Sequence, residues 1–219
     1  MTDYAEMTLD ELRAAMIGEI ARNAAFDGWG PRATETAAGS LGADAGIVTL
    51  AYPGGATDMI DAWFASIDRA MATACPPERL ATLKVREKIT ALVQARLAVL
   101  APERESLRRA LAILAMPQNL PLAGRLAWRS ADVMWRCAGD RATDYNHYTK
   151  RGILAGVYGA TIQVFVDDAG EGYADTRAFL ARRIDGIMRF EKAKAGFLAR
   201  RGHLPSLSRF VGRLRYPAV

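Results

Sequence analysis

The sequence is poor in the residues that metal sites and disulfide frameworks need. Its 219 residues include two cysteines and two histidines. Cys75 and Cys137 form no ligand or disulfide pattern, which indicates ordinary thiols in a reducing compartment. Asp144-x-x-His147 has the spacing of half a metal site, but the sequence holds no second half. No Ser/His/Asp, Cys/His or phosphate-cradling glycine motif occurs either. We therefore expect no cofactor and no catalytic activity.

Long hydrophobic runs are also missing. No apolar stretch approaches the roughly 20 residues that cross a bilayer. The first residues, MTDYAEMTLDEL, are acidic and match neither a signal peptide nor an Arg-rich transit peptide. A bacterial-type cytoplasm or a processed organellar form fits these features. The location we predict is cytoplasmic, of the bacterial type, with peripheral association to a membrane.

Two-residue apolar alternation is absent, and helical signals follow one another along the chain. Thr8 and Glu11 form a capping box before a first apolar face, and Asp44 caps a short helix. The pattern predicts an all-α protein. A first helix begins after Thr8, and others follow at about 33–41, 44–51 and 57–74. A long helix runs from Pro77 to about Leu100, another starts at Pro102 and a seventh ends near Gly139. The last ones lie at about 143–166 and 173–200, with a short one from Pro205.

Lysine and arginine are absent from residues 33–68, although the helix pattern of this part is one that usually needs positive charge. A long helix, two short ones, the turn AYPGG and a fourth helix resemble the TetR class of helix-turn-helix repressors. DNA readers of that class neutralise phosphates, yet this stretch holds five acids: Glu35, Asp44, Asp58, Asp61 and Asp68. The expected recognition helix, DAGIVTLA, offers no guanine or phosphate contact. We expect a TetR-like fold whose helix-turn-helix is degenerate and which binds no nucleic acid; a ligand-responsive regulator remains the alternative.

Positive charge is concentrated at the end of the chain. The net charge is +5, but residues 177–219 hold eleven Lys and Arg against two acids, about +9, which leaves about −4 for residues 1–176. Within residues 205–217 the apolar side chains Leu207, Phe210, Val211 and Leu214 follow helical spacing, with Arg209, Arg213 and Arg215 beside or opposite them. Such a segment is typical of a helix at an anionic membrane surface. A terminal helix docked on its own domain is the alternative.

Four motifs between residues 120 and 190 point to a particular family. They are Ala138-Gly139-Asp140, residues 143–146 (TDYN), residues 148–151 (YTKR) and residues 176–183 (TRAFLARR). Together they resemble the Coq-nine family of ubiquinone-biosynthesis accessory proteins. The resemblance implies a TetR-like fold that has become a lipid-binding protein, and the demethoxyubiquinone hydroxylase as its partner.

The resemblance also implies a division of the chain. We expect a degenerate helix-turn-helix part at 1–74, a helical lipid-binding core at 75–202 and an amphipathic membrane-associating tail at 203–219. A homodimer is the default for this fold. The expected membrane contacts of the tail are Leu207, Arg209, Phe210, Val211, Arg213 and Leu214.

Three glycines at helical spacing, Gly152, Gly156 and Gly159, form a bare ridge between residues 143 and 166. Glycine costs about 1 kcal/mol per helical position relative to Ala, so the ridge indicates either close packing of a helix or room for an apolar ligand. The resemblance favours a pocket for an isoprenoid or other long-chain lipid. Its expected lining residues are Trp128, Trp135, Ile153, Gly156, Val157, Gly159, Phe165 and Met188.

A polar-aromatic stripe begins the same helix. Asp144, His147, Tyr148 and Arg151 share one face, which favours either a solvated face with pairs within the helix or a protein-docking surface. The resemblance implies that this stripe, with Asp132 and Met134, docks the hydroxylase. His147 stands where the family commonly carries Trp.

Overall fold

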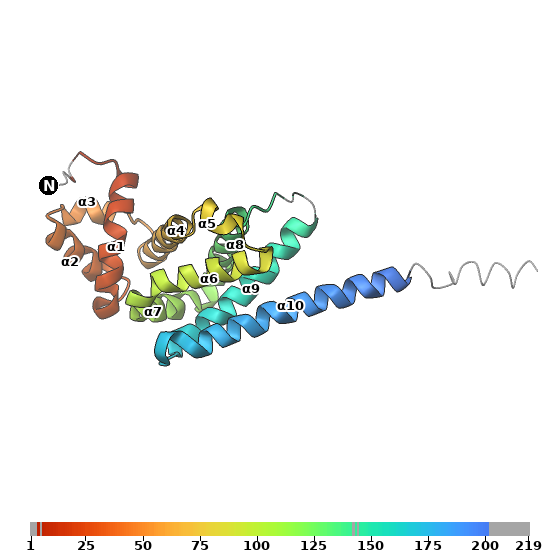
Figure 1. Cartoon of the computed structure of the whole chain (residues 1–219). Helices are drawn as coiled ribbons and strands as arrows, with labels where there is room; N and C mark the ends of the chain where they lie inside the picture. The colour runs from red at the N-terminus through yellow and green to blue at the C-terminus, as the bar shows by residue number, and fades with distance from the viewer. Residues whose placement is uncertain (1–3, 5, 142, 144, 202–219) are drawn as a thin grey trace, which may run out of the picture. The chain divides into compact units, whose positions relative to one another are not determined.

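The chain folds into helices throughout the part that the structure describes (Figure 1). A computed structural model describes residues 4, 6–141, 143 and 145–201, without the side chains of residues 145, 188 and 190–201. Within these residues no strand occurs, so the predicted all-α class is confirmed. The helices are α1 (Leu9–Asp27), α2 (Pro31–Leu41), α3 (Ala45–Leu50), α4 (Ala56–Ala74), α5 (Pro77–Ala81), α6 (Val85–Leu100), α7 (Arg104–Leu114), α8 (Leu120–Cys137), α9 (Tyr145–Asp167) and α10 (Ala174–Arg201), with 3-10 turns η1 (Ala101–Glu103), η2 (Pro117–Asn119) and η3 (Glu171–Tyr173).

Two compact units divide the chain. The first comprises residues 1–180 and holds α1–α9 and the start of α10. The second comprises residues 181–219, of which the helical backbone of α10 is described as far as Arg201. The predicted amphipathic tail at 203–219 lies outside the described residues.

A helix-turn-helix layout opens the first unit. The predicted capping box at Thr8 is present, because its hydroxyl accepts from the Glu11 backbone and the Glu11 carboxylate accepts from the Thr8 backbone. Gly42 takes the left-handed conformation between α2 and α3, at φ 72°, which favours glycine. Asp44 then caps α3 by accepting a 2.9 Å hydrogen bond from the Ile47 backbone.

Helix α4 joins this layout to the rest of the unit. Trp63 on α4 lies 5.1 Å from the ring of Trp29, and its indole N–H donates to Glu103 at 2.9 Å. The Trp29 indole donates to the Ser106 carbonyl of α7 at 2.9 Å. These buried tryptophans each satisfy their one polar group, so they provide large apolar area without an unpaired donor.

The predicted single helix at 77–100 is wrong. The structure breaks it into α5 and α6, with Lys84 in an extended conformation (ψ 155°) between them. The Glu87 carboxylate accepts from the Lys84 backbone N–H at 2.8 Å and so satisfies the exposed start of α6. Lysine is not a preferred cap residue, which is why the sequence pattern concealed this boundary.

Candidate functional site

The motifs at residues 138–151 assemble into one ionic cluster between α8 and α9. Arg151 donates through Nε to Asp132 on α8 at 2.6 Å and through Nη1 to Asp140 in the connecting loop at 3.2 Å. Lys150 Nζ donates to the other carboxylate oxygen of Asp140 at 2.8 Å. Trp135 donates to the Lys150 carbonyl at 3.1 Å and lies beneath its ammonium group. Helices α8 and α9 lie against each other (Figure 1), and the cluster joins them across the loop.

Asp140 is held in its charged form within this cluster. Burial opposes ionisation, but hydrogen bonds and charge from Lys150 and Arg151 outweigh it, and they lower the pKa of Asp140 below its ordinary value. The Arg151 side chain is 3% exposed and that of Asp140 is 8% exposed. Arg136 also pairs with Asp132, at 2.5 Å, but its side chain is 72% exposed. The cluster therefore has a buried centre and a solvated edge.

Exposed aromatic rings lie beside the cluster. Tyr148 is 62% exposed and Trp128 is 36% exposed. Their ring centroids are 6.1 Å apart, and the His147 ring meets Tyr148 edge-on at 5.1 Å. Trp128, His147 and Tyr148 form what we call the aromatic face. Rigid amphipathic rings at a surface are the kind of group that anchors protein interfaces.

The six residues predicted to dock a partner separate into different environments. Tyr148 lies on the surface with His147, but Met134 is fully buried and Arg151 is buried in the ionic cluster. Asp132 is occupied by Arg151 and Arg136. Asp144 lies outside the described residues. Direct contact through Met134 or Arg151 is thus closed in this conformation, and Arg151 donates a 3.1 Å hydrogen bond to the His147 carbonyl within the helix.

The residues predicted to line a lipid pocket are not gathered at one point. Phe165 is fully buried, 4.8 Å from the ring of Tyr173, whereas Ile153 is half-buried twelve positions earlier on α9, about 18 Å along the helix. Trp128 lies in the aromatic face and Trp135 in the ionic cluster. Val157 is half-buried, and the side chain of Met188 lies outside the described part. The lining itself stays a prediction.

The glycine ridge of α9 faces open space. A Cβ added at Gly152, Gly156 or Gly159 would meet nothing within 4 Å. Gly152 and Gly156 are exposed and Gly159 is half-buried. Close packing by a neighbouring helix therefore does not explain the ridge within the described residues.

The fourth motif begins where α9 turns into α10. The Asp168 carboxylate accepts from both the backbone N–H and the hydroxyl of Thr176, at 2.8 and 2.7 Å, and from the Gly170 backbone. These hydrogen bonds, led by the one from the Thr176 backbone, lower the pKa of Asp168. Thr176 is 1% exposed, so this motif residue holds the turn together.

Sequence reasoning found the motifs but missed the roles of Asp140, Lys150 and Asp168. For Asp140 and Lys150 the available signal was that acidic and basic residues occur on both sides of the short loop between α8 and α9. Among the described residues, no group of three or more His, Cys, Asp and Glu side chains is arranged to hold a metal, and no helix is long and apolar enough to cross a membrane.

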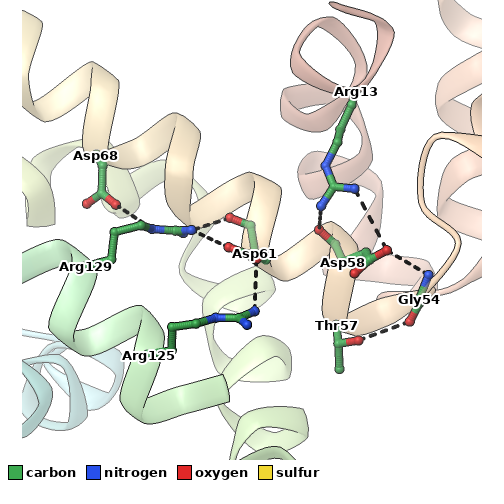
Figure 2. A network of polar contacts seen from close by, with 8 residues as sticks. All are labelled: Arg13, Gly54, Thr57, Asp58, Asp61, Asp68, Arg125 and Arg129. Atoms are coloured by element: carbon green, nitrogen blue, oxygen red, sulfur yellow. Dashed lines mark hydrogen bonds and ion pairs between the residues drawn. The ribbon is translucent and has the colours of Figure 1, made fainter. Parts of the chain in front are cut away.

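Four of the five acids between residues 33 and 68 have structural partners, and three of these are drawn in Figure 2. Arg13 on α1 donates to the Asp58 carbonyl at 3.0 Å, and the Asp58 carboxylate accepts from the Gly54 backbone at 2.7 Å. Asp61 pairs with Arg125 and Arg129 of α8. Asp68 pairs with Arg129 at 3.4 Å and also with Arg96, while Asp44 is the α3 cap described above. These acids therefore serve the fold, and the case against DNA reading depends on the missing basic residues.

The helix-turn-helix layout followed by a larger helical part defines the TetR-like class of folds. The chain is similar to a solved structure titled the TetR transcriptional regulator from Nitrosomonas europaea, with a TM-score of 0.64 and 23% identity over 80% of this chain and 97% of that one. The predicted TetR-like fold is confirmed. At this identity the likeness concerns the fold alone.

The particular resemblance lies in the segment that carries the ionic cluster. Residues 120–191 match the family model COQ9. The chain is 44% identical over 96 residues to the rat protein named "Ubiquinone biosynthesis protein COQ9, mitochondrial" and 41% identical over 96 residues to the human one. A Dictyostelium discoideum protein, "Probable ubiquinone biosynthesis protein coq9, mitochondrial", is 26% identical over 115 residues. The predicted resemblance to the Coq-nine family is confirmed over this segment.

These matches cover part of each protein. They span 44% of this chain for the rat and human relatives and 52% for that of Dictyostelium, but 31%, 30% and 38% of the relatives themselves. The relatives are named mitochondrial, which contradicts the predicted bacterial-type cytoplasmic location. That prediction is wrong; the acidic first residues do not report on location.

Proposed function

We propose that this chain is a non-catalytic accessory protein of mitochondrial ubiquinone biosynthesis. The match of residues 120–191 to the COQ9 family model carries the proposal. The same residues build the ionic cluster and the aromatic face, so the segment most similar to the relatives is also the one with a candidate interaction surface.

In this proposal the chain binds a polyprenylated quinone precursor and presents it at a membrane to the demethoxyubiquinone hydroxylase. The open glycine ridge of α9 supports a ligand or partner along that helix, because each glycine forgoes helix stability without allowing close packing. The test is mass spectrometry of organic extracts from the purified protein. A prenylated lipid is expected to co-purify or to bind on addition; the absence of both would remove the proposal.

The aromatic face is the proposed docking surface for the hydroxylase. Tyr148→Glu should weaken association with the hydroxylase in a pull-down or by surface plasmon resonance, because a charge replaces an exposed ring at the centre of the face. Leu50→Glu is the matched control, since Leu50 is 67% exposed on α3, far from α9 in the chain. Lipid binding should survive both changes. Unchanged association of the Tyr148 variant would refute the assignment.

A ligand-responsive DNA regulator is the second candidate, because the first helices keep a helix-turn-helix layout. Phosphate contacts supply most non-specific affinity for DNA, so even a weakened reader would be retained on DNA at low salt. We expect the purified chain to pass through immobilised duplex DNA at about 50 mM salt without retention. Retention of the full chain that falls as the salt concentration rises would instead favour the regulator.

A further inference from the structure

The start of α6 and the loop between α8 and α9 lie at the same end of the first unit. Lys88 Nζ donates to the Ala138 carbonyl, directly after α8, at 3.4 Å. Eight residues further along α6, Arg96 donates to the hydroxyl of Tyr158, which follows Arg151 by seven residues on α9. Each residue of an α-helix advances it by about 1.5 Å, so α6 and α9 leave this end in the same direction at nearly the same level.

The charge of this end is opposite in sign to that of its surroundings. Residues 76–88 and 132–151, which we call the basic end, hold eight Lys and Arg against five acids, a charge of +3. This count includes the acids of the ionic cluster. Residues 1–176 as a whole carry about −4, so the rest of that range carries about −7. Charges more than about 10 Å apart are largely screened at 0.1 M salt, so the distant acids do not cancel the attraction of the basic end for an anionic surface.

The basic end presents charged side chains and an apolar one to solvent. Lys84, Val85 and Arg86 are consecutive and exposed at the start of α6, and Val85 is 55% exposed. At the end of α8 the Arg136 side chain is 72% exposed, and Arg141 in the loop is exposed as well. An apolar side chain flanked by basic ones suits the interface of an anionic bilayer, which receives the apolar group and attracts the charges.

We propose that the basic end is a membrane contact, in addition to the predicted tail, and that it places the first unit end-on against an anionic lipid surface. The inference deepens the proposed function and rests on it, because it concerns how the chain meets the membrane from which it takes a lipid. The glycine ridge begins at this end with Gly152, directly after Arg151, and continues along α9 with Gly156, where an added Cβ would meet nothing within 4 Å. An apolar chain that leaves the bilayer at the basic end would therefore reach the ridge first.

The test compares two double variants with the same change of net charge. The full chain is mixed with vesicles of phosphatidylcholine, with and without phosphatidylserine, and the bound fraction is measured by flotation. Lys84→Gln/Arg86→Gln should weaken partition onto the phosphatidylserine vesicles at least about tenfold, since one basic residue contributes about fivefold at such a surface. Arg22→Gln/Arg32→Gln is the matched control on α1 and α2, where the side chains are 62% and 82% exposed, and should partition within about twofold of the intact chain.

A second measurement reports on position directly. Val85→Cys, labelled with the solvent-sensitive fluorophore NBD, should brighten by more than about twofold on phosphatidylserine vesicles, because the label enters the bilayer interface. Leu50→Cys, labelled in the same way, is the control, since Leu50 is 67% exposed on α3 and lies outside the basic end. Unchanged emission of the Val85 variant on vesicles that bind it refutes the contact.

Each outcome of the flotation test has a distinct meaning. If Lys84→Gln/Arg86→Gln partitions as the intact chain does, or if both double variants lose binding equally, the basic end is not a membrane contact, while prenylated lipid in the organic extracts keeps the proposed function. An intact chain that binds neither kind of vesicle also refutes the contact, and with no lipid in the extracts the proposed function fails too. Retention of the intact chain on immobilised duplex DNA that Lys84→Gln/Arg86→Gln removes would assign this surface to nucleic acid instead.

Discussion

Arg151 shows how much one residue of a short motif can hold together. Its guanidinium joins α9 to Asp132 on α8 and to Asp140 in the loop, and it is almost fully buried. Removing one member of a buried ion pair leaves the other charges without compensation, which costs far more than losing an exposed pair. The residue is therefore a structural centre of the site, although its sequence position indicated an exposed stripe.

Arg151→Met should lower the free energy of unfolding by about 3 kcal/mol, the lower end of the range for a buried pair, because Asp132 and Asp140 lose their buried partner but keep Arg136 and Lys150. Arg136→Met, which removes a 72% exposed partner of the same Asp132, should cost less than about 1 kcal/mol. Urea denaturation of both variants measures the difference. Similar losses would mean that burial does not govern this cluster.

Asp140 should make the folding stability of the chain depend on pH in the acid range. Its pKa is lowered in the folded chain, so its contribution is fully present above the unfolded value of about 3.9 and is lost as pH falls through the folded pKa. Asp140→Asn should therefore reduce the fall in melting temperature between about pH 5 and pH 2, although it lowers stability at pH 7. Asp167→Asn, at a 75% exposed carboxylate, is the control. An unaltered acid slope in Asp140→Asn would contradict the assignment.

At the scale of single residues the motifs located the segment that holds the ionic cluster, but the spacing did not show which side chains of the cluster pair. Spacing along one helix suggested His147 with Arg151, since those positions are neighbours on its surface. The acids that Arg151 meets, Asp132 and Asp140, lie on another helix and in a loop. Contacts between elements depend on packing, which no periodicity encodes.

Among the elements, α9 combines a rigid attachment with an open ridge. Its first turns are fixed to α8 by the ionic cluster, and its last turn is bound by Arg104 and Arg108 of α7, which donate to the Val166 carbonyl at 3.3 and 2.9 Å. Between these ends the glycines leave backbone exposed. A helix held at both ends can tolerate a poor propensity in its middle.

Gly156→Ala should raise the free energy of unfolding by about 1 kcal/mol, because alanine favours a helix and its methyl group meets open space. Gly139→Ala provides a contrast of opposite sign: Gly139 has a φ of 88°, which strains an alanine. Chemical denaturation of the two variants tests this pair. A loss of stability in Gly156→Ala would indicate that the ridge is packed in solution; lower lipid uptake with higher stability would indicate a binding role.

Most helices could be predicted from the sequence, because cap residues, prolines and apolar spacing agree over most of the chain. Thr8, Asp44 and Gly42 each do what their chemistry favours. The break at Lys84 was not predictable, because its stabilising group is the Glu87 side chain rather than the residue at the boundary. Such a boundary is defined by one hydrogen bond that the spacing of apolar residues does not reflect.

For the whole molecule, charge is unevenly distributed. Residues 177–219 carry about +9 and the remainder about −4. Truncation after Gly202 removes Arg209, Arg213 and Arg215 and should reduce flotation of the chain with anionic liposomes by more than tenfold, since each basic residue contributes about 1 kcal/mol at such a surface. Flotation with neutral liposomes is the control. If the truncated chain floats with anionic liposomes as well as the full chain does, the hypothesis that the tail binds membranes is refuted.

The bonds between Asp140, Lys150 and Arg151 have a consequence for the order in which the molecule opens. Together with the bond from Arg151 to Asp132, they join Asp140 and the start of α9 to α8, so we expect the end of α8 and the start of α9 to open together. Amide hydrogens at the end of α8 and at the start of α9 are then expected to exchange with solvent in a single event rather than independently, which native-state hydrogen exchange would measure. The contact between α8 and α9, which lies within the segment shared with the COQ9 relatives, would then open as one cooperative unit.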